Sequence, residues 1–142
     1  MISPQETLKR ALFWESYLKK YPQSPLKKDA EYLLNAYSYF FFIGLADSPV
    51  SINFEGAIDI QPSTLSEIEQ LATHKNSPLA EQARRFLKFI DLSNDQRHKL
   101  VSSNTENTTP QVQLIQYLKL KPIDLNQVQS RNCFSDAICR SN

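Results

Sequence analysis

A short sequence motif that occurs twice constrains the fold of this chain more than any other feature. Residues 24–34 and 77–87 each begin with Ser-Pro-Leu and continue, at identical offsets, with an alanine and a pair of large apolar residues. Each copy follows a helix-like segment that opens with Thr-Leu. Serine before proline is a typical helix start, because the serine caps the helix and proline has no N–H to leave unpaired. The motif therefore predicts a helix–turn–helix unit used twice, which favours a helical scaffold over a catalytic fold.

The composition limits both the size of the domain and its chemistry. A chain of 142 residues with 41% hydrophobic residues can bury one proper core but not two large ones. Its net charge of +1 gives no electrostatic reason to expect nucleic acid or an anionic membrane as a partner. The two glycines, Gly44 and Gly56, are too few for a phosphate-binding loop. We therefore expect no cofactor.

The helix starts are well marked along the first hundred residues. The expected helices cover residues 4–21, 25–46, about 65–74, 78–92 and 94–101. The second of these becomes apolar on every side in its C-terminal half, which is typical of the buried centre of a domain. The sequence therefore predicts an all-α fold: an array of about five to seven helices built from antiparallel helical hairpins.

Residues 48–62 break the helical pattern and predict one extended insertion. Apolar residues alternate there with polar ones: Val50, Ile52, Phe54, Ile58 and Ile60. A period of two indicates an extended segment with one packed face. A connection of this length in a compact helical domain is often functional. We therefore place the binding function of the chain here.

The remainder of the chain divides into a linker and a C-terminal part. We expect a helical-repeat-like core domain over 1–101, a polar linker over 102–109, and a C-terminal helix and cysteine-bearing tail over 110–142. Residues 110–120 fit either a helix or an alternating strand. The cap formed by Thr109 and Pro110 favours the helix.

Residues 17–26 read Tyr-Leu-Lys-Lys-Tyr-Pro-Gln-Ser-Pro-Leu and continue to Ala30 and the Leu33-Leu34 pair. This stretch resembles the helix turn of tetratricopeptide-type repeats, and is most similar to those of bacterial envelope lipoproteins and periplasmic adaptors. The resemblance covers about residues 5–46 and, more loosely, 64–92. The two copies, starting at Ser24 and Ser77, lie 53 residues apart rather than the usual 34, because the insertion separates them. The resemblance implies protein or peptide binding and no catalysis.

The two cysteines, Cys133 and Cys139, lie close together near the C-terminus. We interpret them as a disulfide that staples the tail, which requires a turn between them because a continuous helix would hold them too far apart. Their spacing does not match the common zinc patterns, and His74 and His98 are distant in sequence. The sequence therefore predicts no metal site.

Glu55 and Asp59 flank Gly56 within the insertion and admit two interpretations. Paired carboxylates serve acid–base chemistry when their surroundings separate their pKa values. Carboxylates in a loop also serve as acidic contact points for a basic partner surface. The second interpretation is favoured, because no histidine or activated nucleophile is nearby in sequence.

Helices four and five carry a local excess of positive charge. The cations are Arg84, Arg85, Lys88, Arg97, His98 and Lys99. Glu81 can pair with Arg85 at i,i+4, so part of this charge is expected to form a self-compensated, solvated face.

The expected partner-binding residues are Phe54, Glu55, Ile58, Asp59 and Trp14. Four of them belong to the insertion. Trp14 belongs to the first helix, where it fits either the core or an exposed partner anchor. The aromatic block at 37–42 is expected to pack in the core.

Two functional hypotheses follow from these features. The first is a non-catalytic protein-binding module of the bacterial cell envelope, of which an immunity protein that neutralises a toxin or enzyme is a narrower version based on analogy. The alternative is a small hydrolase that uses Glu55 and Asp59. A periplasmic or otherwise exported location is expected, with the signal segment absent from this sequence, and a cytoplasmic location stays open. We expect no membrane span, because the longest apolar run is well below the roughly twenty residues required.

Overall fold

The computed structural model describes residues 2–100 and 109–123, and within them it confirms the all-α prediction. The six helices are α1 (Pro4–Lys20), α2 (Lys27–Phe42), α3 (Pro62–Leu71), α4 (Pro78–Ile90), α5 (Asn94–Leu100) and α6 (Pro110–Tyr117). Between α2 and α3 lie a small antiparallel hairpin, β1 (Gly44–Leu45) and β2 (Ser48–Pro49), and the 3-10 turn η1 (Ala57–Asp59).

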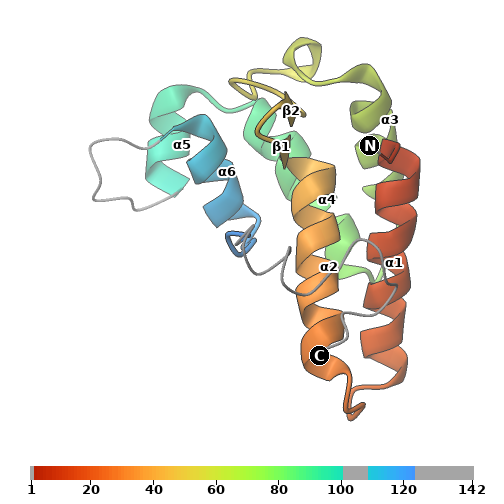
Figure 1. Ribbon diagram of the computed structural model, residues 1–142. Coiled ribbons are helices and arrows are strands. Elements are labelled where there is room, and N and C mark those ends of the chain that lie inside the picture. Colours follow the sequence, from red (N-terminus) through yellow and green to blue (C-terminus); the bar gives the residue numbers. More distant parts are fainter. Residues whose placement is uncertain (1, 101–108, 124–142) are drawn as a thin grey trace.

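Helices α1 and α2 lie side by side as a long antiparallel hairpin (Figure 1). Ser3 caps α1, since its side chain accepts a hydrogen bond from the N–H of Glu6, and Pro4 occupies the first turn. Leu8, Ala11 and Trp14 of α1 are buried in the same apolar cluster as residues of α2 and α4. The hairpin therefore forms one wall of a single core.

Large aromatic side chains fill the centre of this core. Phe41 and Phe42 of α2 are buried, and the ring centroid of Phe42 lies 5.8 Å from that of Phe86 on α4. This confirms that the aromatic block is mainly core packing, with Tyr39 and Phe40 only partly buried.

The two Ser-Pro-Leu motifs have different local structures. Ser77 caps α4 as expected, accepting a hydrogen bond from the N–H of Ala80 at 3.1 Å. Ser24 does not start α2, because its hydroxyl is used within the preceding turn: it is hydrogen-bonded to the hydroxyl of Tyr17 and accepts from the N–H of Leu26. Helix α2 therefore begins at Lys27, two residues later than predicted.

Helix α3 begins earlier than predicted. Pro62 occupies its first turn and Gln61 is the N-cap, so Thr64 lies inside the helix and is buried. Thr64 therefore does not cap the helix.

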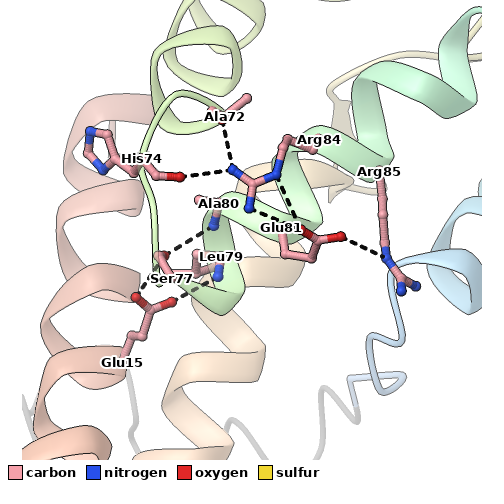
Figure 2. A network of polar contacts seen from close by, with 9 residues as sticks. All are labelled: Glu15, Ala72, His74, Ser77, Leu79, Ala80, Glu81, Arg84 and Arg85. Carbon is pink, nitrogen blue, oxygen red and sulfur yellow. Dashed lines mark hydrogen bonds and ion pairs between the residues drawn. The ribbon is translucent and has the colours of Figure 1, made fainter.

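A polar network joins the N-terminus of α4 to its neighbours (Figure 2). Glu15 of α1 accepts from the hydroxyl of Ser77 at 2.8 Å and from the N–H of Leu79 at 2.9 Å. Arg84 donates to the carbonyl oxygens of Ala72 and His74, which follow the end of α3. These contacts fix how α1, α3 and α4 meet.

Helix α6 is part of the same core rather than a separate unit. Thr109 caps it, accepting from the N–H of Val112, which decides the helix-or-strand alternative in favour of helix. Leu114, Leu118 and Leu120 are buried in the common cluster. The described residues of 110–142 therefore belong to the core that was predicted to end at residue 101. Cys133 and Cys139 lie outside the described residues, as does the 102–108 part of the predicted linker.

Candidate functional site

The insertion loop, which we define as residues 50–60, connects the β1–β2 hairpin to α3 at one end of the helical array (Figure 1). Backbone hydrogen bonds close its base: the N–H of Val50 donates to the carbonyl of Ile43 at 2.9 Å, and that of Gln61 donates to the carbonyl of Val50 at 3.1 Å. The side-chain amide of Gln61 also donates to the carbonyl of Pro49. The loop thus leaves and rejoins the helices at fixed points.

The carboxylate of Asp59 organises the interior of the loop. Its Oδ2 accepts from the hydroxyl of Ser51 at 2.7 Å and from the N–H groups of Asn53 and Glu55, both at 3.2 Å. Ser51 in turn accepts from the N–H of Phe54 at 2.9 Å. The Ser51 hydroxyl, followed by the backbone N–H groups, holds the pKa of Asp59 below its ordinary value, against the opposing effect of partial burial. Asp59 is therefore an ionised structural centre around which the loop folds.

Phe54 turns the loop inward. It is fully buried, with its ring edge-on to Phe86 at 6.0 Å, and its φ of 54° lies in the left-handed region that non-glycine residues rarely adopt. Such a conformation persists only where its surroundings enforce it. The buried ring and the Ser51 hydrogen bond supply that enforcement.

Arg97 of α5 holds the loop from the other side. Its side chain is fully buried and donates to the carbonyl oxygens of Asn53, at 3.1 Å, and Phe54. The guanidinium carbon lies 4.2 Å from the ring centroid of Phe89. The two backbone carbonyls and the aromatic ring thereby compensate for the loss of hydration when the guanidinium is buried.

The charge of Arg97 is only partly compensated. Desolvation lowers its pKa, whereas the negative charges of Glu55 and Asp59 act in the opposite direction. Its Nε is buried without a hydrogen-bond partner among the described residues. A cation buried at this cost is consistent with a specific task, and the contacts identify the task as fixing the backbone at residues 53 and 54.

The outer face of the loop exposes apolar side chains on this fixed backbone. Ile58 is 100% exposed and Ile52 is 76% exposed, and Glu55 is also exposed. Val50, Phe54 and Ile60 point inward instead. The single packed face expected from the alternation is therefore wrong for Ile52 and Ile58, because the turn at Phe54 and the 3-10 turn interrupt the period of two.

Two of the predicted partner-binding residues need correction. Phe54 and Trp14 are buried, and Trp14 packs edge-on against the rings of Phe13 and Tyr17 within α1. Neither can anchor a partner without leaving the core. Of the other three residues, Ile58 and Glu55 lie on the outer face, and Asp59 supports them from within.

The hydrogen bond that joins Glu55 to Asp59 involves the backbone of Glu55 and not its carboxylate: the N–H of Glu55 donates to the Asp59 carboxylate. The lowered pKa of Asp59 is the opposite of what a general acid near neutral pH needs. Neither carboxylate lines any of the three main hollows of the described residues.

Sequence reasoning missed three contributors to the loop: Arg97, Ser51 and Ile52. Arg97 was expected on a solvated basic face. The available signal was the composition of α5, Asn-Asp-Gln-Arg-His-Lys-Leu, whose scarcity of apolar residues leaves a long side chain to fill its buried position. The expected pairing of Glu81 with Arg85 is confirmed at 3.8 Å.

The comparisons with known proteins give no independent assignment. No family model matches the chain, and neither the curated proteins nor the solved structures contain a match. Among residues 2–100 and 109–123, no group of three or more His, Cys, Asp or Glu could hold a metal ion. None of the helices in the same residues is both long and apolar enough to cross a bilayer.

Proposed function

We propose that this chain is a non-catalytic protein-binding module of the bacterial cell envelope and that the outer face of the insertion loop contacts its partner. The observation that carries the proposal is the complete exposure of Ile58 on a loop whose backbone is held by Asp59 and Arg97. Isolated exposed apolar residues are common. A loop that is already held in one conformation, however, loses little conformational entropy when it binds a partner. More of the free energy gained by burying its exposed side chains therefore remains as affinity than for a flexible loop.

The charges around these side chains define the chemistry of the partner. Glu55 on the loop and Asp47 at the hairpin tip are exposed carboxylates. The complementary surface is an apolar cleft with basic side chains at its rim. An enzyme or toxin that acts on an anionic substrate has such a cleft, which is the basis for the narrower proposal of an inhibitor or immunity protein. The envelope location rests on the cysteine pair and on the tetratricopeptide resemblance.

The test uses three versions of the chain as bait in a bacterial envelope extract: the wild type, the double variant I52S/I58S, and the control V112S. Val112 is an aliphatic residue on α6 that is 40% exposed and lies outside the loop. We expect one protein to be captured in stoichiometric amount by the wild type and by V112S, and to be lost from I52S/I58S. Loss of the captured protein's activity would identify an inhibitor, and retention of activity would identify an adaptor.

Two results would count against the proposal. Equal capture by I52S/I58S would show that the loop is not the binding surface. Absence of any captured protein would argue against a binding module and would direct attention to the hydrolase alternative, tested by replacing Glu55 and Asp59.

A further inference from the structure

A second feature lies beside the base of the insertion loop: a cavity of about 360 Å³ bounded by the N-terminal end of α1, the C-terminal end of α2, the β1–β2 hairpin and the start of α3. It is more enclosed than the two other main hollows of the described residues. Its volume lies within the range of small-molecule sites, about 300–1,000 Å³. Protein binding by the outer face of the insertion loop does not explain this cavity.

The walls of this cavity are mainly apolar. Ile2, Phe40, Phe41, Leu45 and Val50 contribute to the lining. Two of the polar side chains in the lining are hydrogen-bonded within the protein: the hydroxyl of Thr7 donates to the carbonyl of Ser3 at 2.9 Å, and the amide of Gln61 donates to the carbonyl of Pro49 at 3.2 Å. The body of a ligand that fits here is therefore apolar, because it gains little from hydrogen bonds to the walls.

One wall carries a charge. Arg10 is the single charged residue among those that line the cavity. Its Nε donates to Glu6 at 3.2 Å and its Nη1 to the hydroxyl of Tyr37 at 3.5 Å. Among the described residues, these bonds leave Nη2 for a ligand, and they hold the guanidinium over the ring of Tyr37, 5.7 Å from its centroid. A fixed guanidinium at the edge of an apolar cavity recognises a carboxylate or another anionic head group.

The hairpin wall of the cavity depends on a glycine. Gly44 lines the cavity at a φ of 89°, and a Cβ at this position would come within 2.6 Å of the carbonyl oxygen of Ser48. Close approach of the two strands at Gly44 shapes this wall, so the hollow is a feature built by the fold and not a gap between mobile side chains.

From these observations we infer that the chain binds a small amphiphile, with its apolar body in the cavity and a carboxylate on Arg10. This inference goes beyond the proposed protein-binding function, and the two sites adjoin at Val50, which is the first residue of the insertion loop and also lines the cavity. The probe for the test is decanoate, compared with decanol, which has the same apolar body and no charge. Hexanoate and octanoate complete the series, and binding to the full chain is measured by isothermal titration calorimetry below micellar concentrations.

We expect saturable binding of one decanoate per chain. Affinity should rise about fourfold for each methylene added along the carboxylate series until the cavity is full, because each buried methylene contributes about 0.8 kcal/mol. Decanol should bind about tenfold more weakly than decanoate.

Two variants assign the site. R10Q should bind decanoate about tenfold more weakly than the wild type does, and should bind decanoate and decanol equally. K9Q is the matched control. Lys9 is an exposed neighbour on the same helix, and its replacement changes the net charge by the same amount. S48F places a ring in the cavity wall and should abolish binding of both probes. If S48F does not fold, as judged by circular dichroism, R10Q and K9Q still decide the question.

Three outcomes would overturn the inference. They are no saturable binding of any member of the series, decanoate binding that is the same in R10Q as in the wild type, and equal weakening by K9Q and R10Q. The last of these would show a general charge effect rather than a site.

Discussion

Arg97 donates a hydrogen bond to the backbone carbonyl of Phe54, 43 residues earlier in the chain. The contact joins the last helix of the expected core to the insertion loop, and both residues are fully buried. A loop that carries two exposed isoleucines is thereby attached to the interior through its backbone. The stability of this attachment is open to direct measurement.

Replacement of Arg97 by methionine tests the attachment. R97M keeps much of the aliphatic volume but leaves the carbonyl oxygens of Asn53 and Phe54 without their donor and removes the contact with Phe89. We expect the free energy of unfolding to fall by about 2–4 kcal/mol, measured by urea denaturation. K99M, at an exposed position of the same helix, should change it by less than about 0.5 kcal/mol. An R97M protein as stable as K99M would mean that the buried cation contributes nothing net, as happens for some buried ion pairs.

Asp59 predicts a pH dependence of stability. Its folded-state pKa is lowered, chiefly by the hydroxyl of Ser51, so its contribution is fully present above the unfolded pKa of about 3.9 and is lost as the pH falls through the folded value. The difference in unfolding free energy between wild type and D59N should therefore be constant above about pH 5 and shrink below about pH 4.

The control for this titration is D47N, which removes an exposed carboxylate at the hairpin tip and should leave the profile close to that of the wild type. A wild-type-minus-D59N difference that grew on acidification would contradict the hydrogen-bond assignment of Asp59.

The sequence predicted the features that depend on residues close together in the chain. The caps at Ser3, Ser77 and Thr109 place a side-chain acceptor within three residues of the N–H that it accepts from, so they can be read from a few adjacent letters. Ser24 shows the limit of this reasoning. It has the same letters as Ser77, but the hydroxyl of Tyr17 on the preceding helix is hydrogen-bonded to it, and the helix starts later.

The candidate site was harder to predict because its residues are brought together by tertiary contacts. Nothing in the alternation of the insertion distinguishes Phe54, which is buried, from Ile52 and Ile58, which are exposed. The distinction depends on the backbone reversal at Phe54 and on the donor from Arg97. The position of the loop could be predicted, but which of its apolar residues face the solvent could not.

We predict that Glu15 of α1 stabilises the N-terminus of α4, although it lies far from α4 in sequence (Figure 2). E15A removes the acceptor for the hydroxyl of Ser77 and the N–H of Leu79, at a helix end where backbone donors otherwise lack partners. We expect a loss of about 1–2 kcal/mol in unfolding free energy, measured by thermal and urea denaturation. E69A, at an exposed position of α3, serves as the control. Equal stability of the two variants would show that water replaces Glu15 at no cost.

The two glycines supply a matched pair of substitutions that separates backbone strain from steric clash. At Gly56, with φ 77° and ψ 172°, an added Cβ meets nothing within 4 Å, so G56A should cost only the strain of a conformation that other residues avoid, about 1–3 kcal/mol. At Gly44, with φ 89°, the Cβ would also lie within 3.0 Å of backbone atoms of Ser48, Pro49 and Val50, which cannot move without opening the hairpin. G44A should therefore lower the free energy of unfolding by clearly more than G56A, because clash is added to strain. Urea denaturation of the two variants measures the difference, and a G44A protein as stable as G56A would show that the hairpin is not packed as the structure describes.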